Sequence, residues 1–239
     1  MRVEIIKCLK DNYSYILINE KNNNACVIDP SESKPIIDFV EKKNINLKFI
    51  LNTHHHHDHV GGNNELKKKY GVKIVGFKND KDKIPEIDIF VEHNQTWINE
   101  DFEARIIHIP GHTLGHICFY FLKDKIVFTG DTLFSLGCGR IFEGTYEQMF
   151  ASLNKLKKLP IDTKIYCGHE YTLKNSIFCL QHEKNNKNLK KKIFEIKDKL
   201  KNNLPTLPST IGEELACNIF LRAKNLEEFS KLRDLKDNF

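Results

Sequence analysis

Residues Thr53-His54-His55-His56-His57-Asp58-His59 are the stretch that decides the fold. Five imidazoles and one carboxylate fall within seven residues, and these are the groups that zinc and iron prefer as ligands. Apolar residues from Leu47 to Leu51 predict a short buried strand before it, and residues 64–70 predict a helix after it. A polyhistidine tag sits at a terminus, without such a strand, so the stretch indicates a metal site.

The spacing within this stretch predicts two groups of ligands. Side chains of an extended segment alternate between two faces, so His54 and His56 share one face and the histidine after each points away. Asp58 and His59 come where the chain turns into the helix, and they can reach a neighbouring point in space. Two ligand groups side by side suit two adjacent metals.

The pattern Thr-His-x-His-x-Asp-His, read from Thr53 to His59, resembles the signature of the metallo-β-lactamase superfamily. The resemblance implies an α/β fold, an αββα sandwich with a metal site at one edge. It also implies three later ligands: a histidine, an aspartate and a histidine, in that order.

Three later residues match this order, and each follows or ends an apolar segment. His112 follows a strand expected at 102–109, and Asp131 follows one expected at 125–128. His169 lies within the last expected strand, at 164–171. An ordered match of this kind makes a chance resemblance implausible.

Length and composition limit the architecture and the partners. A chain of 239 residues, 40% apolar, suits one large domain or one domain with a small appendage. No run of about 18 apolar residues and no secretory signal is visible, so we expect no membrane partner. Seven cysteines without regular spacing predict reduced thiols, and hence a cytoplasmic protein.

The net charge of +5 comes from scattered lysines that lack interleaved aromatic residues. We therefore expect no nucleic-acid partner, although a mild positive field would help an anionic small molecule to arrive. We expect the chain to act as a monomer or a weak dimer.

The pattern of elements changes after Tyr171. Earlier segments predict short strands with a helix at 31–43 and another at 147–156. Later segments predict helices only, at 175–182, 189–200, 211–221 and 226–235. We therefore expect a catalytic domain at 1–172 and a helical substrate-binding domain at 173–239.

Three further stretches point to one family within this superfamily. They are Gly137–Gly144, Tyr166–Thr172 and Leu232–Phe239. They resemble the glyoxalase II family, the hydroxyacylglutathione hydrolases, and the resemblance covers essentially the whole chain. It implies a thioesterase that hydrolyses S-D-lactoylglutathione to D-lactate and glutathione, the second step of methylglyoxal detoxification.

The same resemblance implies two divalent metal ions per chain, zinc before iron or manganese. It assigns His54, His56 and His112 to one metal, Asp58, His59 and His169 to the other, and Asp131 to both. Asp58 and Asp131 would serve catalysis by holding the metals that share a hydroxide, since bound metals lower the pKa of water to about 7.

The glutathione moiety is anionic, and the family binds it with basic and aromatic residues. The matching residues here are Arg140, Phe142, Tyr171, Arg233 and Lys236. Phe142 stands where many relatives have tyrosine, so a hydroxyl contact is lost there. Ile219 replaces a common proline, which puts the local turn in question.

Two alternatives remain open from the sequence. One is glutathione persulfide dioxygenase of the same superfamily, an iron enzyme with one metal and no helical C-terminal module. The other is a non-catalytic basic protein that binds nucleic acid and holds a structural metal. The second ligand group and the tail argue against the first. The open metal positions argue against the second, because structural zinc sites are closed.

Overall fold

The computed structural model describes residues 1–99 and 101–239. Two compact units make up the chain, one of residues 1–108 with 115–124 and one of residues 109–114 with 125–239. The first unit contains β1 (Arg2–Cys8), β2 (Asn12–Ile18), β3 (Asn24–Ile28), α1 (Ser33–Lys43), β4 (Asn46–Leu51), α2 (His57–Val60), α3 (Asn63–Tyr70), β5 (Lys73–Phe77), the 3₁₀ turn η1 (Lys78–Asp80), β6 (Ile89–Val91), β7 (Thr96–Ile98), β8 (Glu103–His108) and β9 (Ile117–Phe121).

Strands β1 to β6 form one sheet in sequence order. The pairs β1–β2 and β2–β3 are antiparallel, and the pairs from β3 to β6 are parallel. Loops at the carboxyl ends of parallel strands commonly carry functional groups. The histidine-rich stretch begins at such an end, directly after β4.

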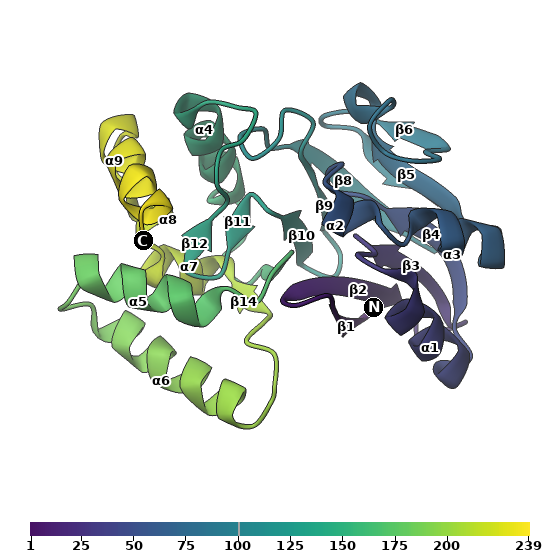
Figure 1. Cartoon of the computed structure of the whole chain (residues 1–239), viewed down its shortest axis with the longest axis horizontal. Helices are drawn as coiled ribbons and strands as arrows, with labels where there is room; N and C mark the ends of the chain where they lie inside the picture. Colours follow the sequence, from purple (N-terminus) through teal and green to yellow (C-terminus); the bar gives the residue numbers. More distant parts are fainter. Residues whose placement is uncertain (100) are drawn as a thin grey trace. The chain divides into compact units, whose positions relative to one another are not determined.

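Helices α1 and α3 cover one face of this sheet (Figure 1). Ile36 and Val40, four residues apart on α1, pack with Leu66 of α3 on apolar residues of the strands. Both predicted helices are therefore confirmed. On strand β4, the side chain of Phe49 points to the opposite face of the sheet from that of Ile50. Its ring meets the ring of Trp97 of β7 edge to face, with centroids 5.1 Å apart. The antiparallel ladder β7–β8–β9 thus packs beside the sheet.

The second unit contains both strands and the C-terminal helices. Its elements are β10 (Ile126–Gly130), β11 (Leu133–Phe134), β12 (Gly137–Cys138), α4 (Tyr146–Leu156), β13 (Lys164–Cys167), α5 (Thr172–His182), α6 (Lys187–Lys201), β14 (Ser209–Thr210), α7 (Ile211–Cys217), α8 (Ile219–Arg222) and α9 (Leu226–Asp237). Strand β13 runs parallel to β10 and antiparallel to β14, and β11 forms a hairpin with β12. Helices α5 and α6 lie side by side (Figure 1).

The C-terminal segment differs from the prediction in two places. A single helix at 211–221 is wrong, because Asn218 adopts an extended backbone (φ −88, ψ 110) that ends α7. Its side chain accepts a hydrogen bond from the N–H of Phe220 and caps α8, so the turn forms without the proline that Ile219 replaces. The prediction of no late strand is also wrong, since Ser209 and Thr210 pair with β13.

A buried polar network ties the β11–β12 hairpin to these helices. The carboxylate of Glu214, fully buried, accepts hydrogen bonds from the N–H of Leu136 at 2.7 Å and from the amide of Asn218 at 2.9 Å. Asn218 also donates to the carbonyl oxygens of Phe134 at 3.3 Å and Gly137 at 3.0 Å. Helix α7 thus satisfies polar groups that the hairpin would otherwise bury without partners.

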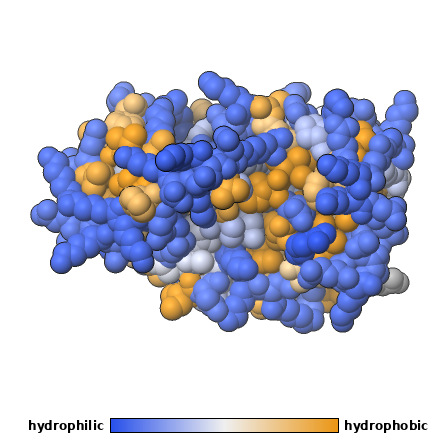
Figure 2. All heavy atoms as spheres, turned by 90° about the horizontal axis from the view of Figure 1, so that it is seen from below, coloured by the Kyte–Doolittle hydropathy of each residue, from blue (hydrophilic) through white to orange (hydrophobic). Residues whose placement is uncertain are grey.

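The face shown in Figure 2 is mostly hydrophilic, with hydrophobic residues gathered in patches. Across residues 1–99 and 101–239, no helix has the length and apolar character needed to cross a membrane.

Candidate metal centre and substrate pocket

The first unit presents four of the predicted ligands on one short segment. His54 is buried just beyond β4, and His56 is the residue before α2. Asp58 and His59 lie within α2, so the turn expected at this point is a helix of one turn. The Nε2 of His59 lies 3.6 Å from Oδ2 of Asp58.

Two glycines allow this segment to pack closely against the chain after β3. A Cβ on Gly61 would lie 2.4 Å from the carbonyl oxygen of Ser31, and one on Gly62 would lie 2.9 Å from that of Pro30. The N–H of Gly62 donates to the same Pro30 carbonyl at 2.8 Å. The Val-Gly-Gly that follows His59 therefore fixes where the ligands lie.

Asp29 orients two of the histidines. Its Oδ1 accepts from the N–H of Thr53 at 2.8 Å, and its Oδ2 accepts from the Thr53 hydroxyl at 2.6 Å. Oδ2 also lies 3.0 Å from Nδ1 of His59. Because the Thr53 hydroxyl donates to Asp29, its oxygen is left to accept from Nδ1 of His54, 3.1 Å away. Both rings then carry the proton on Nδ1 and keep the Nε2 lone pair for a metal.

The second unit presents His112 in the same protonation pattern. Its Nδ1 donates to the carbonyl of Arg140 at 2.7 Å, which again leaves Nε2 as the ligand atom. Gly139 makes this approach possible, because a Cβ there would lie 1.8 Å from the carbonyl oxygen of Asp131 and 3.2 Å from Nδ1 of His112. The glycine-rich loop therefore supports the metal ligands as well as the substrate residues predicted on it.

Asp131 follows Gly130, whose φ of +46 lies in the left-handed region that glycine adopts at the lowest cost. Its Oδ2 lies 3.2 Å from Nε2 of His169 and 3.5 Å from Nε2 of His112. A carboxylate oxygen between two imidazole nitrogens is the arrangement expected of a bridging ligand. The His169 ring stacks on Tyr171, with centroids 4.6 Å apart and planes 5° apart.

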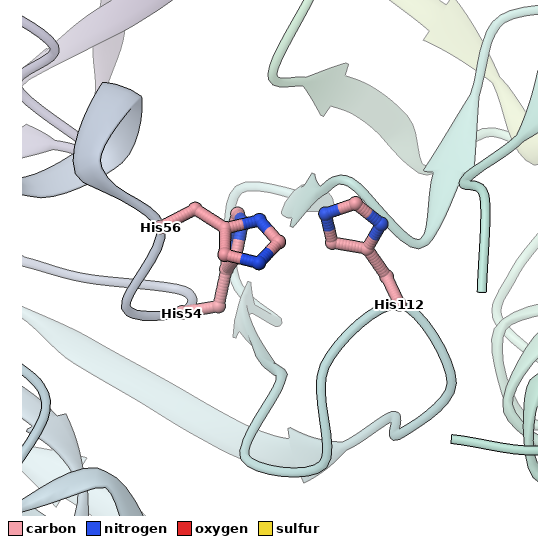
Figure 3. Close-up of side chains that lie close together, drawn as sticks. All are labelled: His54, His56 and His112. Carbon is pink, nitrogen blue, oxygen red and sulfur yellow. The ribbon is translucent and has the colours of Figure 1, made fainter. Parts of the chain in front are cut away.

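Two triads of residues offer ligand atoms that lie within 4.8 Å of one another. They are His54 with His56 and His112, and Asp58 with His59 and His169. The three rings of the first triad face a common space (Figure 3). All the donors are imidazole nitrogens or carboxylate oxygens, so both triads fit a borderline divalent metal.

A third triad, Asp29 with His54 and His59, also meets this distance. The Asp29 oxygens already accept hydrogen bonds, so we interpret Asp29 as the residue that orients the ligands. This role of Asp29 was not predicted from the sequence. The position of Asp29 after the apolar residues 25–28 and before Pro30 was the available signal.

The remaining histidines near the ligands have other contacts. Nδ1 of His55 lies 3.1 Å from Oδ2 of the buried Asp80, and His57 is exposed. The His116 ring stacks on His54, with centroids 4.5 Å apart and planes 18° apart. The positions of His55 and His57 are those expected of side chains that point away from the metal, and His116 supports the ring of His54.

The second unit also contains a pocket of about 280 Å³ beside the β11–β12 hairpin. Its lining residues are Phe134, Cys138, Arg140, Tyr171, Lys174, Asn175, Arg233 and Lys236. Four of the five predicted substrate residues are among them. The fifth, Phe142, is 62% exposed and meets His112 edge to face, with centroids 5.2 Å apart. Two further lining residues, Lys174 and Asn175 of α5, were not predicted from the sequence.

The pocket is strongly basic, and the environment of Lys236 shows its effect. The Lys236 ammonium lies 5.0 Å from the ring centroid of Phe178 and 4.7 Å from that of Phe239. Burial, followed by the nearby charges of Arg233 and Lys174, lowers the pKa of Lys236 to about 8. An anion in this pocket would relieve that repulsion.

Comparisons with known proteins agree with the fold. The family model of the metallo-beta-lactamase superfamily matches residues 10–169. The crystal structure of ETHE1 from Myxococcus xanthus superposes with a TM-score of 0.75 at 23% identity, covering 98% of this chain and 90% of that one. The protein therefore has the metallo-β-lactamase fold with an added helical segment, as predicted, and the triads are typical of its binuclear metal site.

The C-terminal helices identify one family within the metallo-β-lactamase superfamily. A model described as the hydroxyacylglutathione hydrolase C-terminus matches residues 170–239. A hydroxyacylglutathione hydrolase of Pelagibacter ubique (strain HTCC1062) is 66% identical over 239 residues, all of both chains. One from Prochlorococcus marinus (strain MIT 9301) is 44% identical, covering 97% of this chain and 94% of that one. The chain belongs to the hydroxyacylglutathione hydrolase family.

Proposed function

We propose that this protein is a binuclear-metal thioesterase that hydrolyses S-D-lactoylglutathione to D-lactate and glutathione, the second step of methylglyoxal detoxification. The observation that carries the proposal is the 66% identity to a hydroxyacylglutathione hydrolase over both entire chains. The two ligand triads and the basic pocket supply the groups that this reaction requires.

We infer that the centre binds two divalent ions, with zinc as the first choice and iron or manganese as alternatives. His54, His56 and His112 would hold one ion, Asp58, His59 and His169 the other, and Asp131 would contact both. When bound, such ions supply a water whose pKa is lowered to about 7 and polarise a carbonyl oxygen.

The protein's own residues prepare this site in two ways. Asp29, Thr53 and the Arg140 carbonyl fix the ring protons on Nδ1, so the Nε2 atoms are ready to bind without a tautomer change. Asp58 and Asp131 add negative charge that balances the ions, and we assign them the catalytic role. No protein acid is needed for the leaving group, because a thiol of pKa about 8.5 leaves readily as thiolate.

We assign the pocket beside the β11–β12 hairpin to the glutathione moiety. Glutathione carries two carboxylates and one ammonium, and Arg140, Arg233 and Lys236 provide positive charge on the pocket wall. Tyr171 lies in the same wall and stacks on the ligand His169, so it joins the substrate pocket to the metal centre. Phe142 would contribute its ring and main chain only.

The thiols support a proposal for the cellular setting. All seven cysteines are free and buried, and burial raises the pKa of Cys167 and Cys179, so neither is a reactive thiolate. We propose a reducing compartment, the cytoplasm, with a monomer or weak dimer as the working form and neither nucleic acid nor membrane as partner. Sedimentation of the purified protein would measure the oligomeric state.

The function is tested by incubating metal-loaded protein with S-D-lactoylglutathione and measuring loss of the thioester, release of D-lactate and bound metal per chain. We expect hydrolysis that depends on the metal. A protein with two metals per chain that leaves the thioester intact would overturn the proposal.

A further inference from the structure

The basic pocket contains four cations, but two of them are already paired. Arg140 donates to Asp237 through Nε at 3.2 Å and through Nη2 to its carbonyl at 2.9 Å. Arg233 donates to the same Asp237 carboxylate at 3.1 and 2.8 Å and to the carbonyl of Cys138 at 2.7 Å. The two arginines therefore share one carboxylate. The buried Arg233 uses most of its donors within the protein, whereas the exposed Arg140 uses two of its five N–H groups there.

The two lysines of the pocket are not paired in the way the arginines are. Within the described part of the chain, the ammonium of Lys236 has aromatic rings beside it and no hydrogen-bond acceptor. Lys174 reaches the same pocket from α5, and among the described residues its ammonium has no hydrogen-bonded or ion-paired partner. The positive charge of Lys174 is close enough to Lys236 to contribute to the lowering of its pKa.

Helix stability does not explain a lysine at position 174. Lys174 lies in the first turn of α5, where a positive charge opposes the helix dipole. The turn contains no acidic residue, and the N-cap residue Tyr171 makes no capping hydrogen bond with its side chain. Lys174 is exposed, and its charge would be more favourable in the last turn of a helix than in the first. The lysine stands instead at the wall of a pocket that holds a second unpaired ammonium.

We propose that Lys174 is a specificity-determining residue that binds one carboxylate of the glutathione moiety, beside Lys236. The inference rests on the proposed function and extends it, because Lys174 is then the fourth cation of the subsite. Two carboxylates of the ligand meet two ammoniums that have no acceptor within the described protein, while the paired arginines shape the pocket. Charge-assisted hydrogen bonds of this kind are about twice as strong as neutral ones.

The test compares Lys174→Met and Lys174→Glu with the matched control Lys190→Met. Lys190 is an exposed lysine of α6 outside the pocket, so its loss reports the general effect of removing one charge. For S-D-lactoylglutathione, we expect Lys174→Met to raise KM by about fivefold to tenfold with kcat unchanged, and Lys174→Glu to raise it further. A lactoyl thioester of N-acetylcysteamine, which lacks both carboxylates, should be hydrolysed equally by all variants.

Binding is measured separately by calorimetry with S-methylglutathione, a thioether that is not hydrolysed. If the wild type hydrolyses lactoylglutathione but Lys174→Met matches Lys190→Met in KM and affinity, the role of Lys174 is refuted and the proposed function stands. If the wild type binds the thioether in a Lys174-dependent way without hydrolysing the thioester, the role of Lys174 stands and the proposed function is refuted. A wild type that neither hydrolyses nor binds would overturn both.

Discussion

The guanidinium of Arg233 donates a hydrogen bond of 2.7 Å to the main-chain carbonyl of Cys138, 95 residues earlier in the sequence. Arg233 is only 4% exposed, and its remaining donors meet Asp237. From the sequence, Arg233 was predicted to contact the glutathione moiety. The structure shows a buried arginine that holds the glycine-rich loop against α9.

Arg233 is therefore expected to act on substrate binding through the shape of the pocket. Replacing Arg233 and Lys236 together by alanine should raise KM for S-D-lactoylglutathione by about tenfold or more and leave the metal content unchanged. Arg233→Lys should recover little of the loss, because lysine cannot reproduce the planar fork of donors. Steady-state kinetics with metal analysis would measure both.

The double variant also has a clear contrary outcome. A wild-type KM would show that neither side chain contributes to recognition. A lowered metal content would show that the loop, through the contact between the Arg140 carbonyl and His112, had lost its hold on the metal ligands.

The affinity for glutathione ligands should fall as pH rises through about 8. The pKa of Lys236 is lowered to about 8, chiefly by burial, so the unliganded side chain loses its charge above that pH. Calorimetric titration with S-methylglutathione from pH 7 to pH 9.5 would show the loss. Lys236→Arg should flatten the curve, because arginine stays charged.

The comparison of wild type with Lys236→Arg also distinguishes titration of the protein from titration of the ligand. The amino group of the ligand also titrates at alkaline pH, and its contribution is the same for both proteins. If wild type and Lys236→Arg show the same pH dependence, Lys236 is not the titrating group.

Removal of metal by a chelator should abolish hydrolysis, and re-addition of zinc, iron or manganese should restore it. Asp131→Ala should reduce activity more than loss of any single histidine ligand, because the Asp131 oxygen lies within 3.5 Å of two ligand histidines. Metal content and kcat measured side by side would check this. A fully active preparation with one metal per chain would contradict the binuclear assignment.

His55 and His57 should be dispensable as ligands, although they lie inside the histidine-rich stretch. His55 contacts Asp80 and His57 is exposed, so alanine at either position should leave the metal content near that of the wild type. His57→Ala is the sharper test, because the exposed His57 side chain gives up less contact on truncation than His55 does. Loss of one metal equivalent in that variant would show that the ligand assignment is shifted.

The fold and the ligand candidates of the histidine-rich stretch could be predicted because both depend on local patterns. His54, His56, Asp58 and His59 lie in one stretch whose spacing limits the geometry, and an apolar strand marks its start. The orienting role of Asp29 could not be read this way. It depends on a contact with His59 across 30 residues, and an isolated aspartate before a proline is equally typical of a turn.

The basic pocket beside the β11–β12 hairpin was also only partly predictable from the sequence. Its cations were partly recognised by resemblance, but their different roles depend on which of them Asp237 neutralises. Lys174 carries no motif in the sequence, and only the packing of α5 beside the hairpin brings it to the pocket wall. The break at Asn218 was missed because an apolar periodicity continues through a residue whose side chain caps the next helix.

The buried contact of Glu214 with the β11–β12 hairpin has a consequence for recombining relatives of this family. A crossover placed at residue 172 would join helix α7 of one parent to the hairpin of another, and any mismatch would leave a buried carboxylate facing the wrong donors. A crossover near residue 125 keeps both partners from one parent, in line with the compact unit that contains residues 125–239. Hybrids made at these two positions should therefore differ in thermal unfolding, with the earlier junction giving the more stable chimera.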